Sequence, residues 1–322
     1  MKKLKVFLGL FVCAFMVMPF MGVKAINVDN IGGNVTSEQK ENVWYLTLKG
    51  DDKQDIEIRK DETVILDLNG FNLTNYTDGC STIWIQNGGT LTIVDSKGTG
   101  TIKKLNASAA PTIKNDGTLV LEGGLISSIG EKSAALNNAG DLTVKGGTIT
   151  TEADNVFGLV NEGTTVIEGG KFIQAHNFSA LNNASKMEIK GGEFAISEGN
   201  TGAYSLITNQ GSTSTASLEV TGGTFKANKG VFFNEGEDKV TVSGGSYSHD
   251  VSAYLADGFE MKEENGEFVL VDSSVTPEVP EESKDEVKDE TENPKTSDGI
   301  IMVVIGLAVS AVVAIIAHKK LA

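Results

Sequence analysis

The chain has 322 residues, of which 37 are glycine and five are proline, and its formal net charge is −16. Both ends are basic, so the middle of the chain is even more acidic. This excludes a nucleic-acid partner, because binding a phosphate backbone requires a cationic surface. Arg59 is the one arginine and there are three histidines, which leaves little material for arginine clamps or a histidine metal site. Abundant glycine with little proline favours a turn-dense, all-β chain.

Residues 1–25 have the layout of a secretory signal peptide. A lysine-rich start and an apolar run lead to the small-residue exit Val23-Lys24-Ala25. This order predicts export with cleavage after Ala25, and an uncleaved membrane anchor is the alternative. Cys80 is then the one cysteine of the mature chain. We expect it to be buried and inert, since an unpaired thiol in an exported protein rarely serves catalysis.

The C-terminal part of the chain predicts an anchor. Residues 300–317 carry no charge and just reach the length of a membrane-spanning helix. The basic tail at 318–322 places that end in the cytoplasm. Residues 272–299 are rich in acids and lack aromatic side chains, so we expect a disordered linker that holds the body away from the anchor.

The segment before the apolar span resembles the cell-wall sorting signal of Gram-positive bacterial surface proteins. It reads Asn293-Pro294-Lys295-Thr296-Ser297, and the motif, apolar span and basic tail follow in the order of that signal. The resemblance implies that a sortase cleaves after Thr296 and joins the chain to cell-wall peptidoglycan. Asparagine and serine stand where the common LPxTG pattern has leucine and glycine, which leaves the sortase class open. A plain membrane anchor is the alternative, and either arrangement places the body outside the cell.

The middle of the chain, residues 26–271, repeats itself with a period near 22 residues. A period of this length predicts a solenoid and argues against several independent domains. In each unit, apolar residues fall two positions before an asparagine, two before a glycine pair and two after it, as short alternating strands would place them. The glycine pairs are at 123–124, 146–147, 169–170, 191–192, 222–223 and 244–245. The positions before the asparagine hold Ile85, Ile113, Leu136, Leu159, Leu181, Ile207 and Phe232.

We therefore expect an all-β fold, a single right-handed parallel β-helix of about nine coils of 22–23 residues each. Strand patterns at 44–48, 56–58 and 64–68 predict its first coils and an N-terminal cap. At the other end, Asn265-Gly266 separates two short apolar-alternating runs. Such a pair is typical of a β-hairpin turn, and the hairpin would close the C-terminal end of the solenoid.

The asparagines of the repeat form a column of their own. An amide both donates and accepts, so stacked asparagines bond from coil to coil, with each bond contributing about 0.5–1.5 kcal/mol. We expect this ladder to be structural, and a ligand-binding row is the alternative. A second column, just before the glycine pairs, alternates in charge through Glu122, Lys145, Glu168 and Lys190, which favours the stacked register. The predicted ladder comprises Asn87, Asn115, Asn138, Asn161, Asn183, Asn209 and Asn234.

Several segments resemble the pectate-lyase-like (pectin lyase-like) β-helix regions of large Gram-positive surface proteins. They are residues 64–103, the GGTI and GGTF units, and the closing stretch GGSYSHDVSAYLADGFE. The similarity spans about residues 40–271 and implies a β-helix at the cell surface. It implies little about activity, because this fold carries lyases, hydrolases, adhesins and inert stalks.

The repeat offers no clear catalytic constellation. A β-helix lyase is expected to have clustered aspartates for calcium and a basic catalytic residue, whereas Arg59 lies outside the regular coils. A β-helix glycosidase needs a carboxylate pair at a suitable separation. Asp116 and Glu162 instead share one place in the turn of the repeat, which is typical of turn chemistry. We therefore predict no catalytic residue, no metal ligand and no cofactor.

A binding site is easier to support from the sequence. Because Ile85 belongs to an inward column, Trp84 is expected to point outward. Gln86 follows it, and Tyr76 and Asp78 lie in the preceding loop, so these four residues form a candidate glycan platform. In the alternative interpretation, Trp84 is covered by the N-terminal cap or by a neighbouring loop.

The sequence as a whole predicts a non-enzymatic cell-surface protein, held at the cell wall or membrane, that serves adhesion or display. Its expected partners are a sortase and peptidoglycan, the membrane, and a glycan or host-surface ligand. The alternatives are a polysaccharide lyase or glycoside hydrolase of the β-helix type, and a passive component of the wall.

Overall fold

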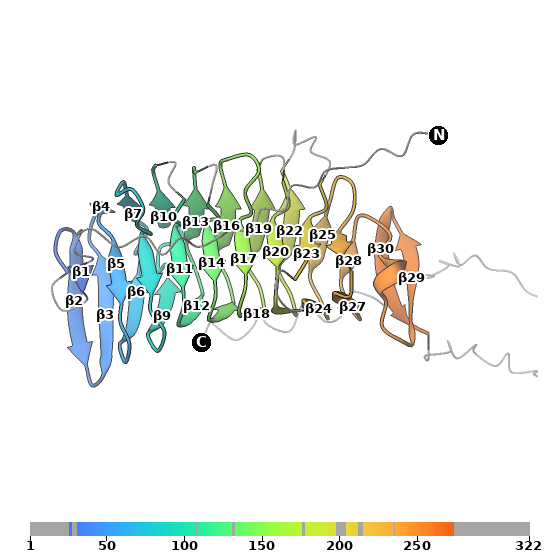
Figure 1. Cartoon of the computed structure of the whole chain (residues 1–322), viewed down its shortest axis with the longest axis horizontal. Coiled ribbons are helices and arrows are strands. Elements are labelled where there is room, and N and C mark those ends of the chain that lie inside the picture. Colours follow the sequence, from blue (N-terminus) through green and yellow to red (C-terminus); the bar gives the residue numbers. More distant parts are fainter. Residues whose placement is uncertain are drawn as a thin grey trace, which may run out of the picture. The chain divides into compact units, whose positions relative to one another are not determined.

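The computed structural model describes residues 26–27, 31–106, 109–130, 133–175, 178–197, 204–211, 215–234 and 236–273. Within them, the chain winds through about eight turns of a parallel β-solenoid that ends in an antiparallel hairpin (Figure 1). The predicted parallel β-helix is confirmed, with about eight coils in place of nine. The predicted signal peptide, sorting motif and membrane-spanning helix lie outside the described residues. No helix among the described residues is long and apolar enough to span a membrane.

Each coil contributes one strand to each of three sheets, which we call sheets A, B and C. Sheet A is parallel throughout, so its strands on successive coils pair with the same register. Its nine described strands are, in order, β1 (Ile26–Asn27), β5 (Ile56–Ile58), β8 (Ile83–Ile85), β11 (Ile113–Asn115), β14 (Leu136–Asn138), β17 (Leu159–Asn161), β20 (Leu181–Asn183), β23 (Ile207–Asn209) and β26 (Phe232–Asn234).

Sheet B begins with an antiparallel pair and continues as a parallel sheet. The first strand, β2, is almost wholly exposed and carries charged side chains, features that discourage pairing with another chain at an open sheet edge. The strands are, in order, β2 (Val35–Lys40), β3 (Val43–Leu48), β6 (Thr63–Asp67), β9 (Thr90–Val94), β12 (Thr118–Leu121), β15 (Asp141–Val144), β18 (Thr164–Ile167), β21 (Lys186–Ile189), β24 (Ser217–Val220) and β27 (Lys239–Val242).

Sheet C carries the C-terminal hairpin, which pairs antiparallel with the last solenoid strand. The hairpin turn is Asn265-Gly266, as predicted, and both residues have positive φ (55° and 82°), as a type I′ turn requires. A short 3-10 helix, η2 (Ser252–Tyr254), precedes it. The strands are, in order, β4 (Asp52–Lys53), β7 (Asn72–Asn75), β10 (Thr101–Lys104), β13 (Leu125–Ser128), β16 (Thr148–Thr151), β19 (Lys171–Gln174), β22 (Glu193–Ile196), β25 (Thr224–Lys226), β28 (Ser246–Tyr247), β30 (Glu267–Asp272) and β29 (Phe259–Glu264).

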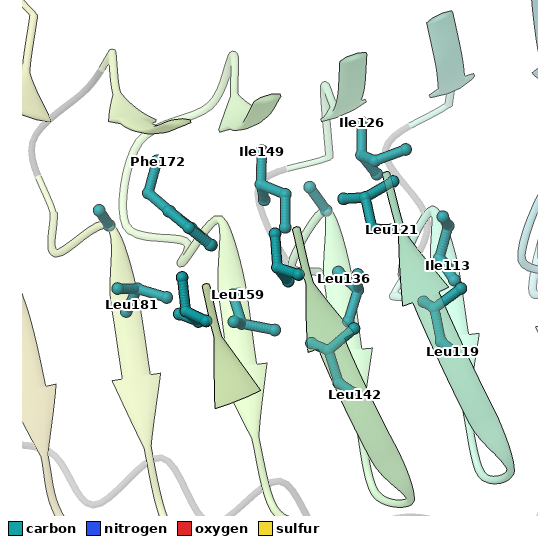
Figure 2. Close-up of a cluster of buried hydrophobic side chains, with 14 of the residues drawn as sticks. Ile113, Leu119, Leu121, Ile126, Leu136, Leu142, Ile149, Leu159, Phe172 and Leu181 are labelled. Carbon is teal, nitrogen blue, oxygen red and sulfur yellow. The ribbon is translucent and has the colours of Figure 1, made fainter. Parts of the chain in front are cut away.

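The core consists of apolar columns that run along the solenoid. Ile126, Ile149 and Phe172 occupy one register position on three successive coils, and each is at most 1% exposed. Figure 2 shows them in one cluster with buried leucines from the other two sheets. Burying a side chain of this size contributes about 1.5–3 kcal/mol, so repetition of the column over the coils supplies most of the stability.

The column of sheet C becomes aromatic toward the C-terminal end. Phe172, Phe194, Phe225 and Tyr247 stack with ring centroids 4.7–4.8 Å apart and planes within 7° of parallel. The hydroxyl of Tyr247 donates to the carbonyl oxygen of Gly244 at 2.6 Å, and burial raises the pKa of this phenol. The polar end of the last ring is therefore satisfied inside the core.

Six asparagines form a continuous ladder inside the solenoid, next to the apolar columns. Each Nδ2 donates to the Oδ1 of the asparagine on the next coil, at distances of 2.6–2.9 Å. At the C-terminal end of the ladder, Nδ2 of Asn234 donates to the carbonyl oxygen of Asp238 instead. The members are Asn115, Asn138, Asn161, Asn183, Asn209 and Asn234.

Asn87 was wrongly placed in this ladder. The register pairs Asn115 with Ile85, and Ile113 with Ile83, so the apolar Ile85 takes the asparagine position on that coil. Asn87 is exposed in the loop 86–89, which is longer than the equivalent connections 116–117 and 139–140. The ladder stops there because a buried isoleucine has no amide partner to offer Asn115.

The alternating charge column is only partly paired. Lys145 Nζ lies 3.1 Å from Glu122 Oε1 on the preceding coil, whereas Lys190 pairs with Glu188 of its own strand at 3.3 Å. We expect Lys145→Glu to lower the free energy of unfolding by no more than about 1 kcal/mol, because the pair is exposed and screened by solvent. The loss of stability is measured by comparing the thermal midpoint of this variant with that of Lys97→Glu, which alters a similarly exposed lysine. Equal melting midpoints for the two variants would show that the pair of Lys145 with Glu122 does not stabilise the stacked coils.

The three corners of the coil differ in length. Sheet B turns into sheet C through short glycine-containing segments such as 122–124 and 145–147, where Gly124 and Gly147 have positive φ. Sheet C turns into sheet A through longer segments of varying length, such as 76–82, 152–158 and 197–206. We call this the C–A corner. Variable loops on a rigid scaffold are where binding residues concentrate, so this corner is the first place to search for a site.

Candidate ligand-binding groove

Trp84 points outward from β8, as the alternation of the strand requires. Its indole Nε1 donates to Asp116 Oδ2 at 2.7 Å, and Lys114 Nζ reaches the same oxygen at 2.7 Å. The Lys114 ammonium also lies 5.0 Å from the centroid of the indole ring. The indole therefore contacts side chains of the next coil through both its edge and its face, which makes it a poorer sugar platform than an open ring.

Gln86 belongs to the same outer surface of sheet A. Its Nε2 donates to Glu57 Oε1, and Arg59 Nε lies 3.7 Å from the other oxygen of Glu57. Farther along the solenoid, at the turn after β17, burial and then the charge of Asp116 raise the pKa of Glu162. These polar groups mostly bind each other, and the surface is best described as a stabilising network.

Tyr76 and Asp78 lie elsewhere, at the C–A corner. The four predicted platform residues therefore divide between two surfaces. Tyr76 is 54% exposed, and Lys53 Nζ of β4 lies 5.3 Å from its ring centroid. Asp78 is exposed in the same loop. Tyr76 has the exposed ring that Trp84 lacks.

A groove of about 420 Å³ runs over the outer face of sheet C, and one of its lining residues is Lys53, which lies against the ring of Tyr76. Its walls come from the first coils and combine hydroxyl, amide, ammonium and carboxylate groups with two leucine side chains. Residues of four adjacent strands meet here, although they are more than seventy positions apart in sequence. The lining residues are Asp51, Asp52, Lys53, Asn72, Thr74, Thr101, Lys103, Leu105, Leu125 and Glu152.

Hydrogen bonds fix the orientation of the polar lining. The backbone and side-chain nitrogens of Asn72 both donate to Asp51 Oδ1 at 2.9 Å, and they hold the pKa of this carboxyl below its ordinary value. Thr101 Oγ1 donates to Asn72 Oδ1 at 2.6 Å. A chain of three side chains on three coils is therefore held in place before any ligand arrives.

The two lysines of the groove differ in what they bind. Lys103 Nζ pairs with Glu152 at 2.6 Å, and Ser127 Oγ donates to the same carboxylate oxygen at 3.0 Å. Lys53 rests against Tyr76 and forms no ion pair with any described residue. Lys53 therefore has donors to offer a ligand, next to an exposed ring.

Buried polar groups support the loop that carries Tyr76. Lys104 is fully buried, and its Nζ donates to the carbonyl oxygens of Thr77, at 3.1 Å, and Cys80. Its register partner Asn75 accepts from Thr77 N and donates to Ser81 O at 3.1 Å. Burial lowers the pKa of Lys104 and raises that of the half-buried Cys80 thiol, which makes the thiol less reactive.

The chemistry of the groove suits non-covalent recognition. Among the described residues, no cluster of three or more histidine, cysteine, aspartate or glutamate side chains is placed to hold a metal ion. An exposed ring beside fixed hydroxyl, amide and ammonium groups matches the alternating apolar and polar faces of a sugar.

The sequence did not reveal this groove. Most of its lining residues occupy outward positions of short strands or the adjoining loops, where the repeat pattern gives no constraint, and they carry no motif. The one available signal was the variable spacing between the strands that now form sheets C and A, which marks the C–A corner.

Comparison of the chain with protein-family models, with curated proteins and with solved structures found no match. The resemblances to wall-sorted and pectate-lyase-like proteins therefore remain predictions.

Proposed function

We propose that this chain is a non-enzymatic cell-surface protein, anchored by its C-terminus to the cell wall or membrane, whose solenoid binds a glycan in the groove beside Tyr76. The export signal, acidic linker and sorting-like motif of the sequence support the location. The observation that carries the binding function is the groove itself, lined by a prearranged Asp51–Asn72–Thr101 network and by Lys53, which forms no ion pair with a described residue and lies against the exposed Tyr76 ring.

The charge of the protein favours a neutral sugar. The chain is strongly acidic, with a net charge of −16, and three carboxylates line the groove. Long-range repulsion would slow the approach of an anionic polysaccharide. Hydroxyl and acetamido groups, by contrast, are matched by the threonine, asparagine and lysine side chains of the lining.

The direct test is binding of the purified full chain to a glycan array, followed by comparison of two tyrosine variants. We expect Tyr76→Ala to weaken binding of the captured glycan about two- to tenfold, since loss of one stacked ring removes roughly 0.5–1.5 kcal/mol. The matched control is Tyr45→Ala, because Tyr45 is also exposed (38%) and also lies under a lysine, Lys40, at 5.5 Å. Isothermal titration measures both affinities.

Two outcomes would overturn the proposal. Equal losses in Tyr76→Ala and Tyr45→Ala would show that the groove is not the site. Release of shorter sugars during incubation with the array glycans would replace the adhesin with the hydrolase or lyase alternative.

A further inference from the structure

A row of aromatic side chains follows the same C–A corner farther along the solenoid. The ring centroids of Phe157 and Phe178 are 4.4 Å apart, and those of Phe178 and Tyr204 are 5.1 Å apart. Tyr204 is 42% exposed, and the two phenylalanines are half-buried. We call these three residues the aromatic row. None of them belongs to the buried core, so their contacts stabilise the loops but leave ring surface open to solvent.

The row and Tyr76 lie in loops of the same C–A corner, beside the groove on the outer face of sheet C. Tyr76 directly follows β7 of sheet C, whereas Phe157, Phe178 and Tyr204 stand two or three residues before β17, β20 and β23 of sheet A, at the other end of the corresponding loops. Between β7 and β22 lie five strand-to-strand steps of about 4.8 Å, so the two ends are separated by about 24 Å along the axis. This is the scale of an extended chain of several sugars.

Polar groups accompany the rings. Ser179, next to Phe178 in sequence, is buried, and its hydroxyl lies 3.0 Å from that of Thr208 on β23. Asn182, the register partner of Thr208, holds an outward position on β20. Rings that recur on successive coils beside hydroxyl and amide groups suit a polymer whose units also recur. A folded protein partner would need a broader contiguous apolar patch than three rings provide.

We propose that a linear neutral polysaccharide lies along the C–A corner, parallel to the solenoid axis, with one segment in the groove beside Tyr76 and another on the aromatic row. This inference rests on the proposed glycan-binding function and specifies its ligand as an extended chain. Two contacts on one polymer act as linked sites, so a chain long enough to reach both binds more tightly than a short one.

The test uses chitin and xylan oligomers, each as a tetramer and an octamer, with the full chain in isothermal titration. We expect the octamer of the preferred sugar to bind wild type at least tenfold more tightly than its tetramer. Tyr204→Ala should remove this gain and leave tetramer binding unchanged. The matched control is Tyr45→Ala, because Tyr45 is also exposed (38%) but lies on β3 of sheet B.

The outcomes separate the two proposals. Equal affinity for octamer and tetramer, or retention of the gain in Tyr204→Ala, overturns the extended site and leaves the groove standing. Absence of binding to both oligomer series and to every glycan of the array overturns both. Should Tyr204→Ala fold poorly, Tyr204→Leu retains apolar bulk in the loop and is expected to lose the same gain, because leucine has no ring face for a sugar.

Discussion

Replacing Asn183 with alanine is expected to lower the free energy of unfolding by about 3–5 kcal/mol, as measured by chemical denaturation. Asn183 is fully buried, and its Nδ2 donates to Asn209 Oδ1 at 2.7 Å and to Ser217 O at 2.9 Å. Its Oδ1 accepts from Asn161 Nδ2 at 2.8 Å. Alanine leaves these buried partners without Asn183, and each unsatisfied group costs about 1–3 kcal/mol.

The neighbouring residue provides the control for this prediction. Asn182 is the same amino acid on the same strand, but it occupies the outward position of β20 and is only half-buried. We expect Asn182→Ala to change the free energy of unfolding by no more than about 0.5 kcal/mol. Similar losses in the two variants would mean that the ladder bonds contribute no special stability. Both substitutions replace an asparagine of the same strand, so both change the strand propensity equally. The difference between the two variants therefore measures the loss of the buried hydrogen bonds.

Much of the fold was predictable because stacking repeats one environment on every coil. The position two after each glycine pair is apolar from Ile126 to Tyr247, and the structure buries every member of that column. The same holds for the Asn265-Gly266 turn, whose local conformation needs two residues that tolerate positive φ. These features depend on neighbours at fixed sequence separation, so a single sequence contains them.

The first regular coil was misaligned for a physical reason. Sequence spacing equates Asn87 with Asn115, but the buried position itself accepts either an asparagine with ladder partners or an apolar side chain. Ile85 fills it, and a longer loop moves Asn87 to the surface. The position of the asparagine in the repeat unit cannot reveal such a shift, because the length of the loop changes at the same place.

The candidate site was beyond sequence reasoning for a different reason. The sequence singled out Trp84 by alternation, which correctly turned it outward, but its cover comes from Lys114 and Asp116 on the next coil. Tyr76 was named only as one of three residues accompanying Trp84, although its ring contacts Lys53, which lines the groove. Surface contacts across coils depend on rotamers and loop paths, and outward positions carry no periodic pattern from which to infer them.

Replacing Phe194 with alanine is expected to destabilise the solenoid by about 3–5 kcal/mol, because it removes a fully buried ring from the middle of the aromatic stack. Phe172 and Phe225 contact it from either side, with centroids 4.8 and 4.7 Å away, so the cavity opens toward both neighbouring coils. Chemical denaturation beside Phe233→Ala, at an exposed phenylalanine, measures the difference. Equal stability of the two variants would contradict a continuous packed column.

The same substitution connects the core to the proposed extended site. Phe194 lies on β22, and the loop after this strand carries Tyr204. A cavity beneath β22 should loosen that loop, while the groove, whose nearest lining strand β13 is three strands away along sheet C, keeps its own packing. We therefore expect Phe194→Ala, under conditions where it remains folded, to reduce octamer affinity toward the tetramer value and to leave tetramer affinity unchanged. A parallel loss of tetramer binding would show that the groove depends on the whole solenoid, whereas unchanged octamer binding would separate the aromatic row from the core beneath it.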